Sequence, residues 1–340
     1  MRPTPFIVAS LFAVCAGHAK PLAEAAEAMV AKLPAGCLVT AEQTPQGTRF
    51  ALAGQSPDPT QAPESLVFEI ASLTKIFTGI LLAEAVVEKK VTLDTTVAEL
   101  LGRGFTFADE RVGRITLKQL STHTSGLPRM PDNFTNGFEG YARYDDARML
   151  AWLAEVKLKQ DGPHACSYSN IGVALLGHLV AKQYGKPWTE CVLEKVCRPL
   201  GLTHTQPSHL PSLGPLAPPY RGPQPGIVTT FQAFAPAGSL RSTAADMLKF
   251  GQALAHPERT PLKDALTLAL QAHADSNDKG GKVGLGAFRA GPPERIAYVH
   301  DGATASYRSS IQVIPALDTV RVVLMNNNTM EGSDVLKAMK

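Results

Sequence analysis

The sequence predicts an α/β (α+β) protein, in which an antiparallel sheet is flanked by helices and an all-helical domain is inserted between its two parts. Strand-like runs occur near both ends of the 340-residue chain, and helical patterns fill the middle. A single sheet assembled from distant segments, with helices packed on it, explains that order. We therefore expect a discontinuous α/β domain over 20–93 and 225–340, and a helical domain over 94–224.

The first third of the chain supplies one side of this sheet. Residues Pro21–Leu33 are Ala-rich and favour a helix. The runs Cys37–Ala41 and Thr48–Ala53 flank a Thr-Pro-Gln-Gly cluster and predict a hairpin. The strand-like run Leu66–Ile70 then leads into Ala71–Val87, whose apolar residues recur at helical spacing. A long, mostly buried helix is expected there.

The remaining elements are predicted from helical spacing of apolar residues and from strand-like composition. Helical stretches are expected near Tyr144–Val156, Ile171–Tyr184 and Pro187–Val196. β-Branched and aromatic residues predict strands at Gly284–Arg289, Ile296–His300, Tyr307–Ile314 and Thr319–Met325.

Composition excludes several classes of protein. Hydrophobic residues make up 44% and charged residues 19%, which is typical of an ordered globular chain. The net charge is +3 and the longest basic run is the pair Lys89 and Lys90, so no nucleic-acid partner is expected. No H-E-x-x-H or C-x-x-C spacing occurs, and we expect neither a metal nor a cofactor.

The segment 1–19 resembles an export signal. Arg2 precedes the apolar run Phe6–Ala16, and small residues around Ala19 suit cleavage after that position. The run is too short for a stable membrane span. An exported protein, periplasmic or secreted, is predicted; the alternative is a buried N-terminal strand or helix.

Cleavage of that signal would remove Cys15 and leave an even number of cysteines. An even count suits disulfides in an oxidising compartment and allows three connectivities. Buried thiols that pack as small apolar side chains are the alternative. The four residues are Cys37, Cys166, Cys191 and Cys197.

Ser72 and Lys75 are the first pair of residues that could perform chemistry. Three positions apart at the start of a predicted helix, they share one face. A lysine among apolar groups is more easily neutral than one in water, so Lys75 could accept the serine proton. Ser276 and Lys279 repeat the spacing in a polar loop, where we expect solvated surface.

Tyr168 and Asn170 precede a second apolar helix. A phenol near an ammonium group can be held partly as phenolate and shuttle a proton, and an amide can donate to a substrate carbonyl. The alternative for Tyr168 is a buried tyrosine whose hydroxyl is hydrogen-bonded.

The run His300, Asp301, Gly302 and Ala303 ends a predicted strand. Glycine there would let a substrate approach the strand edge, with His300 lining the same pocket. The backbone amides of Ser72 and Ala303 could then stabilise the oxyanion of a tetrahedral intermediate. A strand ending in a turn with a surface histidine is the alternative.

Taken in order, Ser-x-x-Lys, Tyr-x-Asn and His-x-Gly resemble the motif set of class C β-lactamases, D-Ala-D-Ala carboxypeptidases and β-lactamase-fold esterases. The resemblance covers roughly Leu38 to Asn328. Further matching segments are Phe68–Thr78 (FEIASLTKIFT), Ile115–Pro128 (ITLKQLSTHTSGLP), Pro199–Thr205 (PLGLTHT) and Pro236–Met247 (PAGSLRSTAADM).

The resemblance implies a β-lactamase/transpeptidase-like fold with the site between its two domains. It also implies that Ser72 is the nucleophile, that Lys75 and Tyr168 are acid and base, and that Asn170 contacts the substrate. The family's C-terminal helix would begin near Glu331.

The third motif departs from the class C pattern of lysine, threonine and glycine. Asp301 would repel a substrate carboxylate, and His300 carries less positive charge than lysine. Asp301 could instead favour a neutral or amine-bearing substrate, or turn away from the pocket. His123 and Ser125 could also be interpreted as a catalytic pair, but the resemblance treats their segment as a structural loop.

The sequence therefore predicts a serine hydrolase that forms an acyl-enzyme and acts on amide or ester bonds. Its expected partners are small substrates, namely D-amino-acid-containing cell-wall peptides or small esters. The alternatives are a class C-type β-lactamase and a penicillin- or peptidoglycan-binding protein that acylates without turnover.

Overall fold

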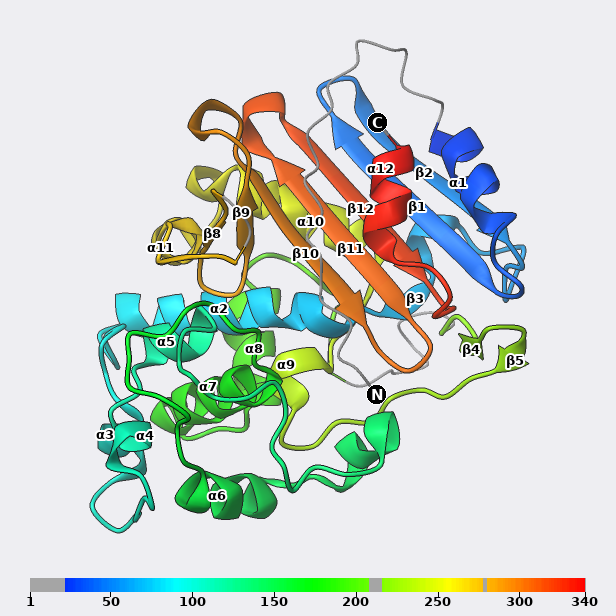
Figure 1. The fold of residues 1–340 in the computed structure, drawn as a ribbon. Helices are drawn as coiled ribbons and strands as arrows, with labels where there is room; N and C mark the ends of the chain where they lie inside the picture. Colours follow the sequence, from blue (N-terminus) through cyan, green and yellow to red (C-terminus); the bar gives the residue numbers. More distant parts are fainter. Residues whose placement is uncertain (1–21, 208–215, 278–279, 340) are drawn as a thin grey trace.

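The computed structural model describes residues 22–207, 216–277 and 280–339 (Figure 1). The predicted export signal, 1–19, lies outside these residues, and so does Lys279. No helix in the described part of the chain is long and apolar enough to cross a membrane.

Within the described residues, an antiparallel sheet of eight strands forms the centre of the fold. Its order is β2-β1-β12-β11-β10-β9-β8-β7. The strands are β1 (Cys37–Thr44), β2 (Gly47–Gly54), β7 (Ala274–Asp275), β8 (Lys282–Val283), β9 (Phe288–Ala290), β10 (Ala297–Ala303), β11 (Arg308–Ile314) and β12 (Thr319–Met325). Because β1 pairs with β12, Val39 lies opposite Leu324, and the first and last strands of the chain are neighbours. The predicted assembly of one sheet from distant segments is confirmed.

Shorter strands pair outside this sheet. β3 (Val67–Glu69) pairs with β6 (Arg241–Thr243), and β4 (Tyr220–Arg221) pairs with β5 (Gln224–Pro225). The run at 66–70 is therefore a strand, but it lies apart from the central sheet.

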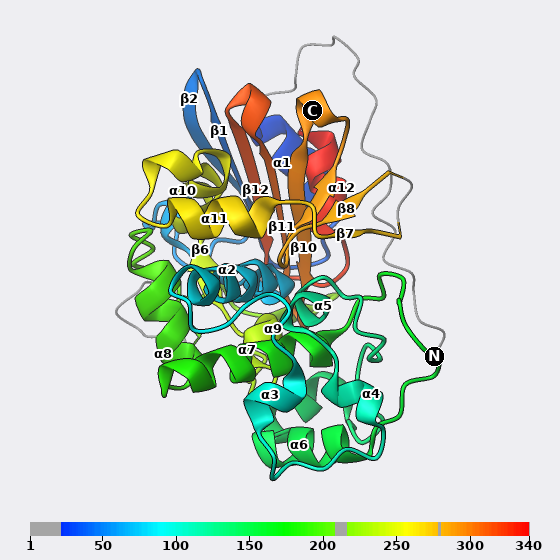
Figure 2. The same cartoon turned by 90° about the vertical axis from the view of Figure 1, so that its left-hand side faces the viewer.

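Helices cover both faces of the sheet. α1 (Leu22–Val30) and α12 (Gly332–Ala338) lie on one face, and α10 (Ala244–Ala255) and α11 (Lys263–Leu270) lie on the other (Figures 1 and 2). A small apolar core lies under α1 and α12, and the main core fills the opposite side.

The long helix α2 (Thr74–Val87) separates the sheet from the other helices (Figure 1). Those helices are α3 (Val97–Leu101), α4 (Glu110–Gly113), α5 (Leu117–Ser121), α6 (Asp146–Glu155), α7 (Asn170–Tyr184), α8 (Trp188–Val192) and α9 (Ala235–Gly238). Apolar residues surround both α2 and α7, and both are buried on nearly all sides. The domain boundaries at 94 and 224 stay a prediction.

One predicted strand is wrong in its first half. Residues 284–287 form a turn before β9, in which Gly286 has a positive φ of 85°. A Cβ at Gly286 would lie 2.2 Å from the carbonyl oxygen of Lys75, so this turn packs directly on α2. Close packing on a neighbouring helix replaces strand pairing there.

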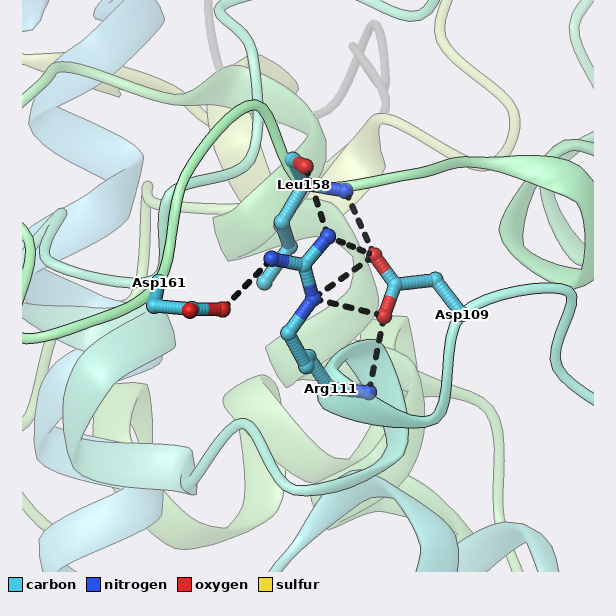
Figure 3. A network of polar contacts seen from close by, with 4 residues as sticks. All are labelled: Asp109, Arg111, Leu158 and Asp161. Carbon is cyan, nitrogen blue, oxygen red and sulfur yellow. Dashed lines mark hydrogen bonds and ion pairs between the residues drawn. The ribbon is translucent and has the colours of Figure 1, made fainter.

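A polar network fixes the chain between α6 and α7 (Figure 3). Asp109 accepts hydrogen bonds from Arg111 Nε at 2.8 Å and from the Leu158 amide at 2.9 Å. Arg111 also donates to Asp161 at 2.6 Å. Hydrogen bonds from Arg111 hold the pKa of the Asp109 carboxyl well below its usual range. The network anchors the segment that continues to Tyr168.

The cysteines of the described chain are all buried, and Cys37, Cys191 and Cys197 are free thiols. Burial raises the pKa of Cys37 and of Cys197 to about 12. These thiols pack as apolar groups. The buried cysteines are Cys37, Cys166, Cys191 and Cys197.

Candidate active site

Ser72 lies in a 3₁₀ turn between β3 and α2 and is partly exposed. The preceding residue, Ala71, has a positive φ of 48°, which is unusual for a residue with a side chain. The turn is anchored to the sheet, since the Ile70 carbonyl accepts a hydrogen bond from Ser309 Oγ at 2.8 Å. Tertiary contacts therefore hold the serine in a constrained turn.

Lys75 lies in the first turn of α2 with 1% of its surface exposed. Its Nζ lies 3.1 Å from Ser72 Oγ and 2.7 Å from the Ala237 carbonyl oxygen. Burial, and then the charge of Arg129, lower the pKa of Lys75 well below its ordinary value. A neutral amine is favoured, and it is in hydrogen-bond contact with the serine.

Tyr168 completes this group from the segment before α7. Lys75 Nζ lies 4.9 Å from the centre of its ring, and a hydrogen bond joins the Tyr168 and Ser72 side chains. Burial raises the pKa of Tyr168 above its ordinary value, and this outweighs the hydrogen bond. The structure thus favours a neutral phenol, whereas the sequence suggested a partial phenolate, because desolvation cannot be read from a motif.

Asn170 is the first residue of α7. Its backbone amide donates to the Arg129 carbonyl at 3.0 Å, and its side-chain amide contacts Met130 Sδ at 3.4 Å. Ser169 caps the helix by accepting from the Gly172 amide at 2.9 Å. The cap places Asn170 beside the loop that carries Arg129.

His300 lies on β10 and is 5% exposed, so the structure excludes a surface histidine. Its ring centre lies 6.2 Å from that of Tyr168 and 5.6 Å from that of Phe288. Burial, and then the charge of Lys75, lower the pKa of His300 to about 3. A neutral imidazole therefore lines the site.

Asp301 points away from His300, because successive strand residues face opposite sides of a sheet. Its carboxylate accepts a hydrogen bond from Ser310 Oγ, and charges on or beside α12, Glu331 and Lys337, act on its pKa. Of the two possibilities that the sequence left open, the structure has the side chain turned away from the pocket.

Gly302 faces the nucleophile turn. A Cβ at this position would lie 2.5 Å from the Ile70 carbonyl oxygen and 3.1 Å from Ala71 Cβ. The glycine therefore lets β10 pack against the turn that carries Ser72. This packing also brings the neighbouring Ala303 close to that turn. Packing of the protein on itself, rather than approach of a substrate, requires glycine here.

The sequence motifs left out three neighbours of this group. Arg129 is exposed, and its guanidinium carbon lies 5.1 Å from the centre of the Tyr168 ring. Phe288 lies beside His300, and the ring of His123 lies 4.5 Å from that of Tyr168. His123 lies within the matching segment 115–128, where the resemblance implied a structural loop, and Arg129 directly follows that segment.

Comparisons with known proteins found a matching family model and similar relatives. A family model described as Beta-lactamase matches residues 41–340. Penicillin-binding protein 4 of Amycolatopsis lactamdurans is 28% identical over 292 residues, which cover 76% of this chain and 72% of that protein. The D-alanyl-D-alanine-carboxypeptidase/endopeptidase AmpH of Escherichia coli (strain K12) is 30% identical over 187 residues, covering 55% of this chain and 48% of AmpH.

A solved structure supports the predicted fold class. The class C beta lactamase from Rhodobacter sphaeroides superposes with a TM-score of 0.80 at 24% sequence identity. The superposition covers 93% of this chain and 96% of the other.

Proposed function

We propose, from the premise that this chain belongs to the beta-lactamase family and is a serine hydrolase, that it cleaves amide or ester bonds through an acyl-enzyme on Ser72. The observation that carries the proposal is the contact of 3.1 Å between the buried Lys75 amine and the serine oxygen. A serine hydroxyl needs such a base to become a good nucleophile.

Acylation would begin with proton transfer from Ser72 to the neutral Lys75 amine while Oγ attacks the substrate carbonyl carbon. The ammonium group formed in this step would remain hydrogen-bonded to the Ala237 carbonyl, which lies 2.7 Å from Nζ. Tyr168, which is hydrogen-bonded to Ser72, would pass a proton to the leaving nitrogen or oxygen as its bond to carbon breaks. Tyr168 would recover its proton from the Lys75 ammonium, so that both groups return to their neutral forms. Water would then attack the ester carbonyl and its proton would pass to Ser72 Oγ as the bond to that oxygen breaks, which releases the acid.

The oxyanion of each tetrahedral intermediate would be bound by the backbone amides of Ser72 and Ala303. Support comes from the packing of β10 on the nucleophile turn, which the absence of a side chain at Gly302 permits. Backbone donors held in advance of the reaction stabilise developing charge at no cost of reorganisation.

We propose cell-wall peptides containing D-amino acids as the substrate class, with small esters as a second class. Arg129, an exposed residue whose guanidinium carbon lies 5.1 Å from the Tyr168 ring centre, supports a substrate that bears a carboxylate. His300 is neutral and cannot supply that charge. The positive charge would therefore act from the loop after α5, not from the third motif.

The class C-type β-lactamase remains the second candidate, and the structural similarity to the Rhodobacter sphaeroides enzyme favours it. Rapid hydrolysis of a chromogenic cephalosporin would support this candidate. A penicillin adduct that forms on Ser72 and is never released would instead indicate a binding protein that does not turn over.

The signal-like segment 1–19 supports export, to the periplasm or beyond the cell. Cell fractionation followed by N-terminal sequencing tests this part of the proposal. A mature chain that begins at Lys20 is the expected result.

The test of the nucleophile uses intact-protein mass spectrometry with a fluorescent penicillin and, separately, with p-nitrophenyl acetate. We expect adduct formation or ester turnover in the wild type and in Ser276→Ala, and neither in Ser72→Ala. Ser276 is the matched control because it is the first residue of the second Ser-x-x-Lys sequence. Reaction that persists in Ser72→Ala would overturn the assignment.

The test of the substrate class compares a peptide ending in D-Ala-D-Ala with the same peptide as its C-terminal amide. Arg129→Gln should raise KM for the free carboxylate by about 10-fold, an effect of about 1.4 kcal/mol, and leave KM for the amide unchanged. Equal effects on both peptides would exclude recognition of the carboxylate by Arg129.

A further inference from the structure

His123 is a buried residue that the proposed chemistry does not use. It lies in the loop after α5, it is 1% exposed, and its backbone has a positive φ of 62°. Residues with a Cβ rarely adopt this conformation, and histidine and asparagine are among those that do so most often. Such a conformation in the core of a protein points to a constraint imposed by neighbouring contacts.

His123 contacts the residues directly before and directly after Tyr168 in the sequence. Its carbonyl oxygen accepts a hydrogen bond from the Ser167 amide at 2.7 Å, and its Nδ1 accepts one from the Ser169 amide at 3.2 Å. The imidazole ring lies 4.5 Å from the Tyr168 ring, at an angle of 34°. One residue therefore holds the amide before Tyr168, the amide after it, and the ring itself.

The hydrogen bond to Nδ1 also assigns the protonation state of His123. Because Nδ1 accepts from an amide, the ring proton is on Nε2, which has no hydrogen-bond partner among the described residues. Burial lowers the pKa of His123 well below its ordinary value, and the positive charges that Lys75, His300 and Arg129 carry when protonated lower it further. A neutral imidazole with its acceptor already engaged is suited to holding the chain in place.

We propose that His123 is a positioning residue that holds the Tyr168 hydroxyl against Ser72. The inference rests on the proposed function, because it assumes that Tyr168 transfers a proton. The carbonyl and the ring of His123 both contact the segment 167–169, and His123 makes these contacts in a left-handed backbone conformation. Loss of the Nδ1 acceptor would let the Tyr168 segment shift, and a shift of about 1 Å can cost about 100-fold in rate.

Two substitutions separate the hydrogen bond from the backbone conformation. His123→Asn places an oxygen at the position of Nδ1, and asparagine tolerates a positive φ. His123→Gly tolerates the same φ but has neither acceptor nor ring. With an unactivated alkyl ester as substrate, whose leaving alkoxide must be protonated, kcat should fall about 3-fold or less in the Asn variant and about 10- to 100-fold in the Gly variant.

A double-mutant cycle with Tyr168→Phe distinguishes positioning from damage to the fold. If His123 acts through Tyr168, His123→Gly should lower kcat by about 2-fold or less once the hydroxyl is gone. Damage to the fold would lower kcat by the same factor in both backgrounds, and that result would overturn the inference. An Asn variant as slow as the Gly variant would overturn it as well.

The proposed function can fail separately in the same experiment. Full activity of Tyr168→Phe would show that the hydroxyl transfers no proton. The proposed function of Tyr168 would then fail, and His123 would have no catalytic hydroxyl to position. An inactive Tyr168→Phe combined with equal factors in the cycle would overturn the role of His123 alone.

Discussion

Replacing Gly302 by alanine should slow the enzyme by displacing β10 from the nucleophile turn. The added Cβ would lie 2.2 Å from Ser309 Oγ, 2.5 Å from the Ile70 carbonyl oxygen and 3.1 Å from Ala71 Cβ. Ser309 could change its side-chain rotamer, but the Ile70 carbonyl belongs to the backbone of a hydrogen-bonded turn. The strand and the turn must therefore move apart.

The size of that movement follows from the contact itself. Real Cβ atoms essentially never approach another atom closer than 3.0 Å, so the Cβ and the Ile70 oxygen must separate by at least about 0.5 Å from 2.5 Å. Overpacking of this kind costs about 1–3 kcal/mol of stability. Displacement of Ala303 from Ser72 by a similar distance should lower kcat by about 10- to 100-fold.

The assay is steady-state hydrolysis of p-nitrophenyl acetate, together with the thermal unfolding midpoint. Gly104→Ala is the matched control, because a Cβ at Gly104 meets nothing within 4 Å. The double variant Gly302→Ala, Ser309→Ala should remain slow, since the Ile70 carbonyl is still in place. A Gly302→Ala variant with the kcat and the melting temperature of the wild type would refute the packing argument.

Three further predictions concern charge and thiols. The acylation rate, measured by stopped flow, should rise with pH and level off, because the neutral amine of Lys75 accepts the proton, and the midpoint of the rise should lie well below pH 10.5. Arg129→Gln, which removes a cation, should move that midpoint to higher pH. A wild-type midpoint near pH 10.5 would contradict this prediction. Asp301→Asn should change kcat and KM for the D-Ala-D-Ala peptide by less than about 2-fold, since its carboxylate faces α12; a large change in KM would place it in the pocket. Alkylation of the unfolded, unreduced protein, followed by peptide mass mapping, should modify every cysteine of the described chain, and protection of a pair would reveal a disulfide. Those cysteines are Cys37, Cys166, Cys191 and Cys197.

Local patterns determined much of the fold before any tertiary contact was known. The hairpin of β1 and β2, the helix α7 and the strand β12 lie where periodicity and turn residues place them. The contact of Ser72 with Lys75 is equally local, since residues three apart at a helix start share a face. Motif order then indicated that Tyr168 and His300 belong to the same site.

The tertiary structure decided what depends on residues distant in the sequence. Burial favours the neutral forms of Lys75 and Tyr168, and the packing of α12 on the sheet gives Asp301 partners on the face opposite His300. The contact of His123 with the segment around Tyr168 joins residues 46 positions apart in the chain. Sequence periodicity reports which residues share a face of one element, whereas protonation states and partners depend on what other elements place against that face.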